Sequence, residues 1–394
     1  MIIGIDVAQT CTERAGCGWV ADTLTRAFCR MTAGTDTSVV LYHHFGSWIN
    51  ESTEAGTTVD LPHVTCPMRG LSPVEARRLW QPAASGVELP GRPDLVHSHS
   101  FQAPRIARAK VVATIHDVAF WAHPDFTTEA NRLVCQRGVI EAMENADGLV
   151  FISESVRNEF ERFLPGWLEE SGVCHTVIPW ASRFEPRTKI DGVPSAGAPW
   201  FAYGSLEPRK NFGALLQAYQ EYAVRSAIPR PLWIAGGRGW RSEDLWQQVT
   251  DWTGPGDVRH LGYLDDDALS AQLGNAYCLV FPSWYEGFGL PILEAMTQGC
   301  PVICSRITSL SEIGGEAAIY VDPAQPGTIA DAMLTLEMTP GLRAARAVAS
   351  LDQVRRFSWE STARKTLAFY RTVLAVNLGR PRWERTSANP APLS

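Results

Sequence analysis

The sequence contains no cysteine pair of the Cys-x-x-Cys type, and its nine cysteines are an odd number that cannot all pair within the chain. They are scattered, mostly among apolar neighbours. We therefore expect free thiols in a reducing compartment, not a disulfide framework. Cys300 and Cys304 flank a predicted strand and require no metal.

Long apolar runs are also missing. No stretch of the 394 residues approaches the roughly 20 apolar residues that a membrane-spanning helix needs. The first residues, MIIGIDV, begin as an apolar strand without a basic region or a long apolar segment, so no signal peptide is expected. We expect a cytoplasmic protein, and any membrane association to be peripheral, at the inner face of the plasma membrane.

An excess of positive charge is absent as well. The formal net charge is −7 and the pI is about 5.8, which argues against a nucleic-acid-binding protein because such domains carry a basic surface. A local basic pocket for a phosphate-bearing ligand remains compatible with this balance.

The glycine fingerprint of dinucleotide binding is incomplete. Gly16 and Gly18 form a Gly-x-Gly turn before an amphipathic segment, but the third glycine and the downstream acidic residue are missing. NAD binding is therefore not supported.

The chain is rich in short, continuous apolar runs that alternate with helical patterns. Continuous apolarity is typical of strands buried on both faces, and alternation with helices predicts parallel βαβ units. Twelve such strands are expected at residues 2–7, 38–44, 94–100, 110–117, 148–153, 175–180, 199–205, 231–237, 258–264, 277–283, 301–305 and 317–322. Six strands in each half predict an α/β protein with two doubly wound, Rossmann-like domains that face a cleft.

The predicted boundaries follow from composition. We expect a first domain at residues 1–184, a linker rich in proline and glycine at 185–199, and a second domain at 200–357. A terminal helix at 358–378 follows, with Trp359, Leu367, Tyr370 and Val373 on one face. Residues 379–394 are expected to form a flexible tail.

Two glutamates eight residues apart mark the clearest candidate site, in the segment SWYEGFGLPILEA. Pro291 is expected to open a helix, and Gly287 and Gly289 let the preceding loop direct backbone N–H groups at an anion such as a diphosphate. Glu286 and Glu294 would then accept hydrogen bonds from the hydroxyls of a sugar and a ribose on either side. The plainer interpretation is a loop carboxylate and a carboxylate that complements the helix dipole.

A second candidate loop, YGSLEPRKN, also follows a predicted strand. Arg209 and Lys210 are adjacent, and a guanidinium with an ammonium can hold both phosphates of a diphosphate. Asn211 is expected to cap the next helix. Adjacent basic residues at a helix start also occur on solvated surfaces.

Histidines offer weaker candidates. His116 ends the fourth strand of the first half, where it can reach a cleft or serve as a satisfied core residue. His97 and His99 alternate along their strand, but no third ligand accompanies them, so a zinc site is not expected.

These segments resemble a known family. Glu286 and Glu294 match the E-x7-E pattern of family-four retaining glycosyltransferases with the GT-B fold. The similarity extends over YGSLEPRKN, residues 262–305 and FSWESTARKTLAFY, and is thinner in the first half, at the GCG turn, VHSH and TIHD. It implies that the last helix crosses back onto the first domain.

The resemblance also implies roles for individual residues. Glu286, His116, Arg209 and Lys210 would be catalytic, with Glu286 and His116 near the transferred sugar and the two cations on the diphosphate. Glu294 would bind the ribose. The donor-binding residues implied in this way are Gly16, Gly18, Gly204, Arg209, Lys210, Tyr263, Leu264, Glu286, Gly287, Phe288, Gly289, Leu290 and Glu294.

The implied activity is transfer of a sugar from a nucleotide sugar to a glycan or lipid-linked glycan, with retention of anomeric configuration and without metal or other cofactor. Overall similarity to bacterial polysaccharide mannosyltransferases ranks GDP-mannose first, although the residues do not separate GDP from UDP. The alternatives are a nucleotide-sugar epimerase of the same fold and a non-catalytic nucleotide-sugar-binding subunit. No nucleic-acid partner is expected, and the oligomeric state is left open.

One segment has the composition of a membrane-contacting helix. In RNEFERFLPGWLEE, an apolar face would contain Phe160, Phe163, Leu164, Trp167 and Leu168. We favour an ordinary helix that packs on the sheet, because helices that bind membrane surfaces are usually basic.

Overall fold

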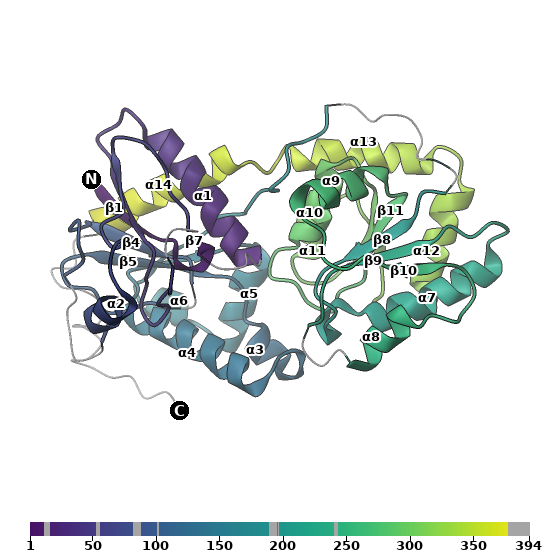
Figure 1. Cartoon of the computed structure of the whole chain (residues 1–394), viewed down its shortest axis with the longest axis horizontal. Coiled ribbons are helices and arrows are strands. Elements are labelled where there is room, and N and C mark those ends of the chain that lie inside the picture. Colours follow the sequence, from purple (N-terminus) through teal and green to yellow (C-terminus); the bar gives the residue numbers. More distant parts are fainter. Residues whose placement is uncertain are drawn as a thin grey trace. The chain divides into compact units, whose positions relative to one another are not determined.

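The computed structural model describes residues 1–11, 16–52, 56–81, 88–100, 102–188, 195, 197–239 and 243–376. Within these ranges the chain forms two compact units, each with its own sheet (Figure 1). The first unit contains Met1–Trp121, Glu129–Trp180 and the chain from Ser358 onward. The second contains Ala122–Thr128 and Ala181–Phe357.

The first unit is built on a seven-stranded parallel sheet with the order β3-β2-β1-β4-β5-β6-β7. Its strands are β1 (Ile2–Asp6), β2 (Ser38–Tyr42), β3 (Val64–Thr65), β4 (Leu95–Ser98), β5 (Lys110–Ile115), β6 (Gly148–Phe151) and β7 (Cys174–Val177). The central strands are buried on both faces, which explains why their sequences are continuously apolar.

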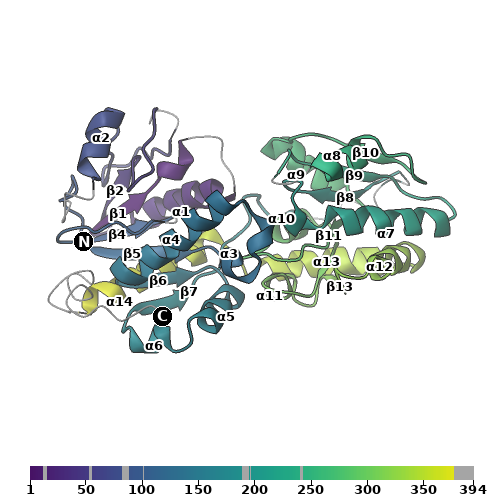
Figure 2. The same cartoon turned by 90° about the horizontal axis from the view of Figure 1, so that it is seen from below.

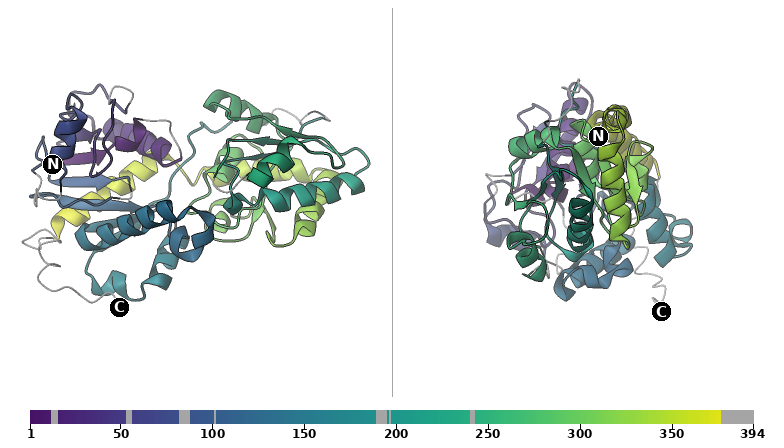
Figure 3. Two further views of the ribbon diagram at one scale, coloured as in Figure 1. Left: turned by 60° about the horizontal axis from the view of Figure 1, so that its bottom comes forward. Right: turned by 90° about the vertical axis from the view of Figure 1, so that its right-hand side faces the viewer.

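The helices associated with this sheet come from both ends of the chain. They are α1 (Gly16–Thr32), α2 (Pro73–Leu79), α3 (Ala119–Ala122), α4 (Glu129–Asn145), α5 (Glu154–Phe163), α6 (Trp167–Glu170) and α14 (Trp359–Ala375), with a 3-10 turn at Ala8–Thr10. The 3-10 turn at Pro124–Phe126 lies in the segment that belongs to the second unit. Helices α1 and α14 lie side by side (Figure 1), and α14 is the yellow helix of this unit in Figure 3.

Helix α14 completes the core of the first unit. Its Phe369, Tyr370 and Val373 are buried among residues of α1 and of the central strands. The Tyr370 ring lies 5.5 Å from that of Phe28 on α1. The Tyr370 hydroxyl also hydrogen-bonds Nδ1 of His97 on β4. The predicted return of the last helix to the first domain is thus confirmed.

The second unit has a six-stranded parallel sheet with the order β10-β9-β8-β11-β12-β13. Its strands are β8 (Trp200–Tyr203), β9 (Leu232–Ala235), β10 (Val258–His260), β11 (Cys278–Phe281), β12 (Val302–Ser305) and β13 (Ile319–Val321). Both sheets therefore have the doubly wound order, in which the strand sequence reverses direction at an interior pair.

Helices cover the second sheet. They are α7 (Phe212–Arg225), α8 (Glu243–Thr250), α9 (Asp266–Asn275), α10 (Leu290–Thr297), α11 (Leu310–Gly314), α12 (Pro326–Met338) and α13 (Leu342–Val354), with a 3-10 turn at Pro208–Lys210. Helices α7 and α12 lie side by side (Figure 2) and contribute Leu215, Tyr219 and Met333 to the core.

The structure agrees with the predicted α/β class, and all twelve predicted strands are present. The sequence interpretation missed β3, whose two residues are too few to form a pattern. The predicted tail at 379–394, the end of the predicted terminal helix, and residues 189–194 and 196 of the predicted linker lie outside the described residues.

The candidate membrane segment is not one helix. It divides into α5 and α6, separated by Gly166 with φ of 77°. Phe160 is buried against Phe151 of β6 and Leu168 is also buried, whereas Phe163 is 36% exposed, so only part of the predicted apolar face packs on the first unit. Among the described residues, none of the helices has the length and apolar character needed to span a bilayer.

Candidate functional site

The two candidate loops of the second unit meet because their strands are neighbours. Strand β8 pairs with β9 on one side and with β11 on the other, so the strand order reverses at the β8–β11 pair. Ligands of doubly wound sheets bind at this position, beyond the carboxyl ends of the strands. The loop after β8 contains Arg209 and Lys210, and the loop after β11 contains Glu286.

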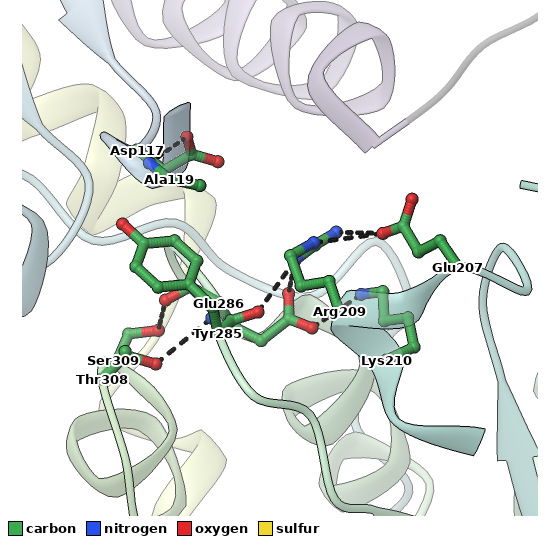
Figure 4. A network of polar contacts seen from close by, with 9 residues as sticks. All are labelled: Asp117, Ala119, Glu207, Arg209, Lys210, Tyr285, Glu286, Thr308 and Ser309. Carbon is green, nitrogen blue, oxygen red and sulfur yellow. Dashed lines mark hydrogen bonds and ion pairs between the residues drawn. The ribbon is translucent and has the colours of Figure 1, made fainter. Parts of the chain in front are cut away.

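Glu286 is the centre of a compact ionic cluster (Figure 4). Its Oε2 accepts a hydrogen bond from Nη1 of Arg209 at 2.8 Å, and its Oε1 accepts one from Nζ of Lys210 at 2.7 Å. Arg209 also pairs with Glu207 at 2.7 Å. Two cations and two carboxylates therefore neutralise one another beside the switch point.

Backbone contacts fix the two loops against each other. The Trp284 N–H donates to the Arg209 carbonyl at 2.8 Å, and Arg209 Nη1 donates to the Tyr285 carbonyl at 3.0 Å. Asn211 has φ of 58°, in the left-handed region, and its side-chain amide donates to the Pro282 carbonyl at 3.0 Å and to a second carbonyl.

The expected side-chain cap by Asn211 is therefore wrong. Asn211 does occupy the position before α7, but its amide joins loops instead of capping that helix, and no side-chain cap bond is formed there.

A third loop, which follows β12, contacts the backbone of Glu286. The Glu286 N–H donates to the Thr308 hydroxyl at 3.2 Å, and the Ser309 hydroxyl donates to the Glu286 carbonyl at 2.8 Å (Figure 4). Sequence reasoning missed both residues, because isolated hydroxyl side chains after β12 carry no distinguishing pattern.

Burial makes this cluster electrostatically sensitive, since only 6% of Glu286 and 8% of Lys210 are exposed. Burial by itself raises the pKa of Glu286, but Arg209 and Lys210 outweigh it and hold that pKa below its usual value. Burial and the neighbouring Arg209 lower the pKa of Lys210, against the opposing attraction of Glu286. Glu286 thus remains ionised in a nearly dry site.

Glu294 lies in a separate network, within the first turns of α10 and only 3% exposed. Its carboxylate accepts hydrogen bonds from the Tyr203 hydroxyl at the end of β8 and from Nη2 of Arg183 at 3.3 Å, and Arg183 Nε forms an ion pair with it at 3.0 Å. Arg183 also pairs with Asp266 at 2.9 Å. Burial raises the pKa of Glu294, and Arg183 opposes this rise without cancelling it.

The glycines of these loops have definite roles. Gly289 precedes α10 with φ of 104°, and Gly204 follows β8 with φ of 136°, conformations that L side chains rarely adopt. Leu290 is the first residue of α10, so Pro291 is the second, one position later than expected. Gly287 is buried in the loop between Glu286 and α10.

The side chain of Phe288 packs inside the second unit. Its ring is buried and lies edge-on to Phe357 at 6.2 Å, which leaves the backbone of this residue as the part that can meet a ligand. Tyr263 and Leu264 follow β10, and the Tyr263 side chain is 76% exposed.

In the first unit, Gly16 and Gly18 are in the first turn of α1, and the preceding residues 12–15 lie outside the described residues. His116 follows β5, is buried, and hydrogen-bonds the His99 carbonyl through Nε2 at 2.8 Å. Its ring also contacts Cys17, so the Gly-x-Gly turn and His116 lie together.

The other histidines of this region are core residues. His97 bonds Tyr370 through Nδ1 and Thr114 through Nε2, the latter at 2.8 Å. No group of three His, Cys, Asp or Glu side chains in the described ranges is arranged to hold a metal ion. All nine cysteines are described and no disulfide joins any two of them, as expected.

Two doubly wound parallel sheets, with the E-x7-E glutamates beside the switch point of the second, define the GT-B class of glycosyltransferases. Residues 15–166 match the family described as Glycosyltransferase Family 4, and residues 200–338 match the one described as Glycosyl transferases group 1. The chain belongs to glycosyltransferase family 4.

Similarity to individual proteins agrees with this assignment. The chain is 33% identical over 307 residues to O-antigen chain mannosyltransferase B of Escherichia coli, covering 76% of this chain and 80% of that protein. It is 29% identical over 302 residues to glycogen synthase of Mycobacterium tuberculosis, covering 72% and 70%. The structure of sucrose-phosphate synthase from Thermosynechococcus elongatus superposes with a TM-score of 0.69 at 19% identity, covering 95% and 99%.

Proposed function

We propose that this protein is a retaining mannosyltransferase that transfers mannose from GDP-mannose to a glycan or lipid-linked glycan during synthesis of a cell-surface polysaccharide. The observation that carries the proposal is the convergence of Glu286, Arg209 and Lys210 at the carboxyl ends of β8 and β11. In this position, two cations can meet a diphosphate while a carboxylate meets the attached sugar.

The chemistry requires negative charge to be stabilised as it develops. When the bond between the anomeric carbon and the diphosphate breaks, the leaving phosphate gains charge, and Arg209 and Lys210 are held where they can stabilise it. The electron pair of that bond leaves with the diphosphate. The acceptor oxygen forms the new bond on the same face of the sugar, and its proton passes to a leaving phosphate oxygen.

The nucleotide would extend from this diphosphate toward the two remaining parts of the site. Glu294 can accept hydrogen bonds from the ribose hydroxyls, and Tyr263 with Leu264 can meet the base. The backbone of Gly287 and Gly289 would lie along the phosphates. The roles of His116, Gly16 and Gly18, which lie in the first unit, stay those that the family resemblance implies.

The choice of mannose rests on the similarity to the O-antigen mannosyltransferase, which spans most of both chains. The glycogen synthase of Mycobacterium tuberculosis is less similar to this chain, at 29% identity, and its name refers to a different sugar polymer. GDP-mannose is therefore the first donor to test, with UDP-glucose and UDP-N-acetylglucosamine as comparisons.

The test is an assay of the purified full-length chain with each donor and a mannose-containing oligosaccharide acceptor, carried out with and without EDTA. We expect mannosyl transfer from GDP-mannose, unaffected by EDTA, and retention of the anomeric configuration by NMR of the product. Lys210→Ala should reduce turnover by about 10²–10³-fold with the donor saturating. Transfer from a UDP-sugar alone, or an inverted product, would contradict the proposal.

Two controls separate the alternatives. Incubation with donor and no acceptor would produce an epimer if the protein were a nucleotide-sugar epimerase. A non-catalytic binding subunit would bind the nucleotide but transfer nothing by itself. If the acceptor carries a lipid, association with the inner face of the membrane is expected, and vesicle sedimentation with and without that acceptor measures it.

A further inference from the structure

Arg183 is the one cation that pairs with Glu294 among the described residues, and sequence reasoning did not identify it. It lies in WASRFEP, three residues after Trp180, where a segment of the first unit ends, and it belongs to the second unit. Its side chain is largely buried, with 19% of its surface exposed. A buried guanidinium in this position is costly unless carboxylates pair with it.

The pairing is that of a fork on a carboxylate. Arg183 Nη2 donates a hydrogen bond to Oε2 of Glu294 at 3.3 Å, and Nε forms an ion pair with Oε1 at 3.0 Å. The Tyr203 hydroxyl donates to Oε2 as well. Because a carboxylate offers about four acceptor positions, the hydrogen bonds from Arg183 Nη2 and from the Tyr203 hydroxyl leave acceptor capacity for a ligand.

Asp266 fixes the guanidinium from the other side. Its Oδ1 accepts from Arg183 Nη1 at 2.9 Å. Asp266 is the first residue of α9, whose preceding Asp265 caps the helix through the Ala268 N–H. Arg183 is therefore held between a helix start and α10, so it cannot rotate away from Glu294 without losing two ion pairs.

We propose that Arg183 is a positioning residue for nucleotide binding, which orients the Glu294 carboxylate so that its remaining acceptor position meets a ribose hydroxyl. This inference rests on the proposed function, in which Glu294 binds the ribose. Arg183 itself need not touch the ligand. Its effect is transmitted through the orientation and the charge of Glu294.

Burial raises the pKa of Glu294, and Arg183 is the principal group that lowers it. Tyr203 also lowers it by hydrogen bonding, Asp266 raises it, and Cys300 lies near Tyr203. Without Arg183 the pKa of Glu294 rises further, so more of the carboxyl is protonated at a given pH and accepts hydrogen bonds poorly.

The experiment is calorimetric titration of the full-length chain with GDP, and with UDP in parallel, from pH 5.5 to 8.5. Arg183→Gln should weaken binding about tenfold or more at the acidic end, the size of one hydrogen bond to a charged group. Binding should recover as the pH rises and Glu294 ionises. Arg183→Lys keeps the charge but loses the fork, so it should weaken binding without a comparable pH slope.

Asp266→Asn is the matched control, because it removes the negative charge of the second partner of Arg183 and leaves the contact of Arg183 with Glu294. We expect a smaller loss of affinity and no acidic weakening, since Asp266 raises the pKa of Glu294. Thermal unfolding of each variant reports folding separately. Wild-type affinity of both Arg183 variants, or a loss in Arg183→Gln that is independent of pH, would overturn the inference.

Glu294→Gln distinguishes this inference from the proposed function. If that variant binds the nucleotide as the wild type does, Glu294 does not bind the ribose. The positioning role proposed for Arg183 is then wrong as well. If Glu294→Gln weakens binding and the Arg183 variants do not, only the role of Arg183 is wrong.

Discussion

The charges around Glu286 balance among the protein's own side chains. Glu286 contacts Arg209 and Lys210, and Glu207 contacts Arg209 as well. A diphosphate that binds this pair of cations must therefore compete with carboxylates already in place. The same carboxylates make it possible to bury an ammonium and a guanidinium in a folded protein without a ligand.

Replacing Glu286 by glutamine should have opposite effects on binding and turnover. Removing the negative charge lessens repulsion of the diphosphate, so we expect GDP affinity to rise by a few-fold or more. Turnover should fall, because the group beside the reacting sugar loses its charge. Calorimetry with GDP and initial rates with saturating donor measure the two effects.

Glu207→Gln is the control for this pair of measurements. It removes a carboxylate from Arg209 but not one from Lys210. Its GDP affinity should also rise, with a smaller decrease in turnover. A decrease in GDP affinity for Glu286→Gln would show that this carboxylate holds the cations in place more than it competes for them.

Asp6 predicts a pH dependence of stability in the first unit. Burial raises its pKa to about 6, although the Ala8 and Ser100 N–H groups donate to its carboxylate. Since the folded state binds this proton more tightly than the unfolded state, its contribution to stability is present at low pH. That contribution is lost as the pH rises from about 4 to about 6, on the order of 3 kcal/mol in all.

Asp6→Asn cannot ionise, so its stability relative to the wild type should improve by about that amount between pH 4 and pH 7. Urea unfolding of both proteins across this range gives the difference at each pH, in which the titration of other groups cancels. A difference that stays constant with pH would contradict the raised pKa.

At the scale of single elements, α14 is joined to the first sheet by both packing and a polar contact. Tyr370 inserts between Phe28 and His97, and its hydroxyl bonds the buried imidazole. Burial lowers the pKa of His97 well below its usual value, so the ring is neutral and needs a partner at each nitrogen. Thr114 satisfies the other nitrogen.

Tyr370→Phe should therefore destabilise the protein by roughly 1–3 kcal/mol, because it keeps the packed ring and removes the partner of a buried polar atom. Thr372→Ala, on the exposed side of the same helix, should change stability by about 0.5 kcal/mol or less. Denaturant unfolding compares the two. Equal effects would mean that the His97 contact contributes nothing.

For the whole molecule, the order of the chain does not follow the order of the units. The first unit receives the segment from Ser358 onward, after the chain has completed the second unit. The core of the first unit therefore contains residues from both ends of the described chain, such as Ile3 and Val373.

Truncation before Ser358 should consequently damage the unit farther away in sequence. We expect a lower unfolding temperature for the first unit, because the buried face of α14 is lost from its core. GDP affinity should change little, because the candidate nucleotide residues of the second unit keep their contacts. Tryptophan fluorescence and calorimetry measure these outcomes, and a truncated chain with unchanged unfolding would contradict the prediction.

The strands were the most predictable feature. The central parallel strands are buried on both faces, so their apolar runs are visible without any knowledge of their neighbours. The glycines before α10 and after β8 were visible for a similar local reason, since their backbone conformations exclude other side chains. Strand β3 was missed because two residues form no pattern.

The pattern of loop residues identified Glu286, Arg209, Lys210 and Glu294, but not what surrounds them. Local interactions specify the strands, the glycine turns and the doubly wound class. Strand order in the sheet brings the loop of residue 209 against that of residue 286, a separation of 77 positions. Glu294 meets Arg183 and Tyr203 across 111 and 91 positions. Such contacts arise only when the sheet has assembled, because no local pattern in the chain records which distant side chain will share a buried carboxylate.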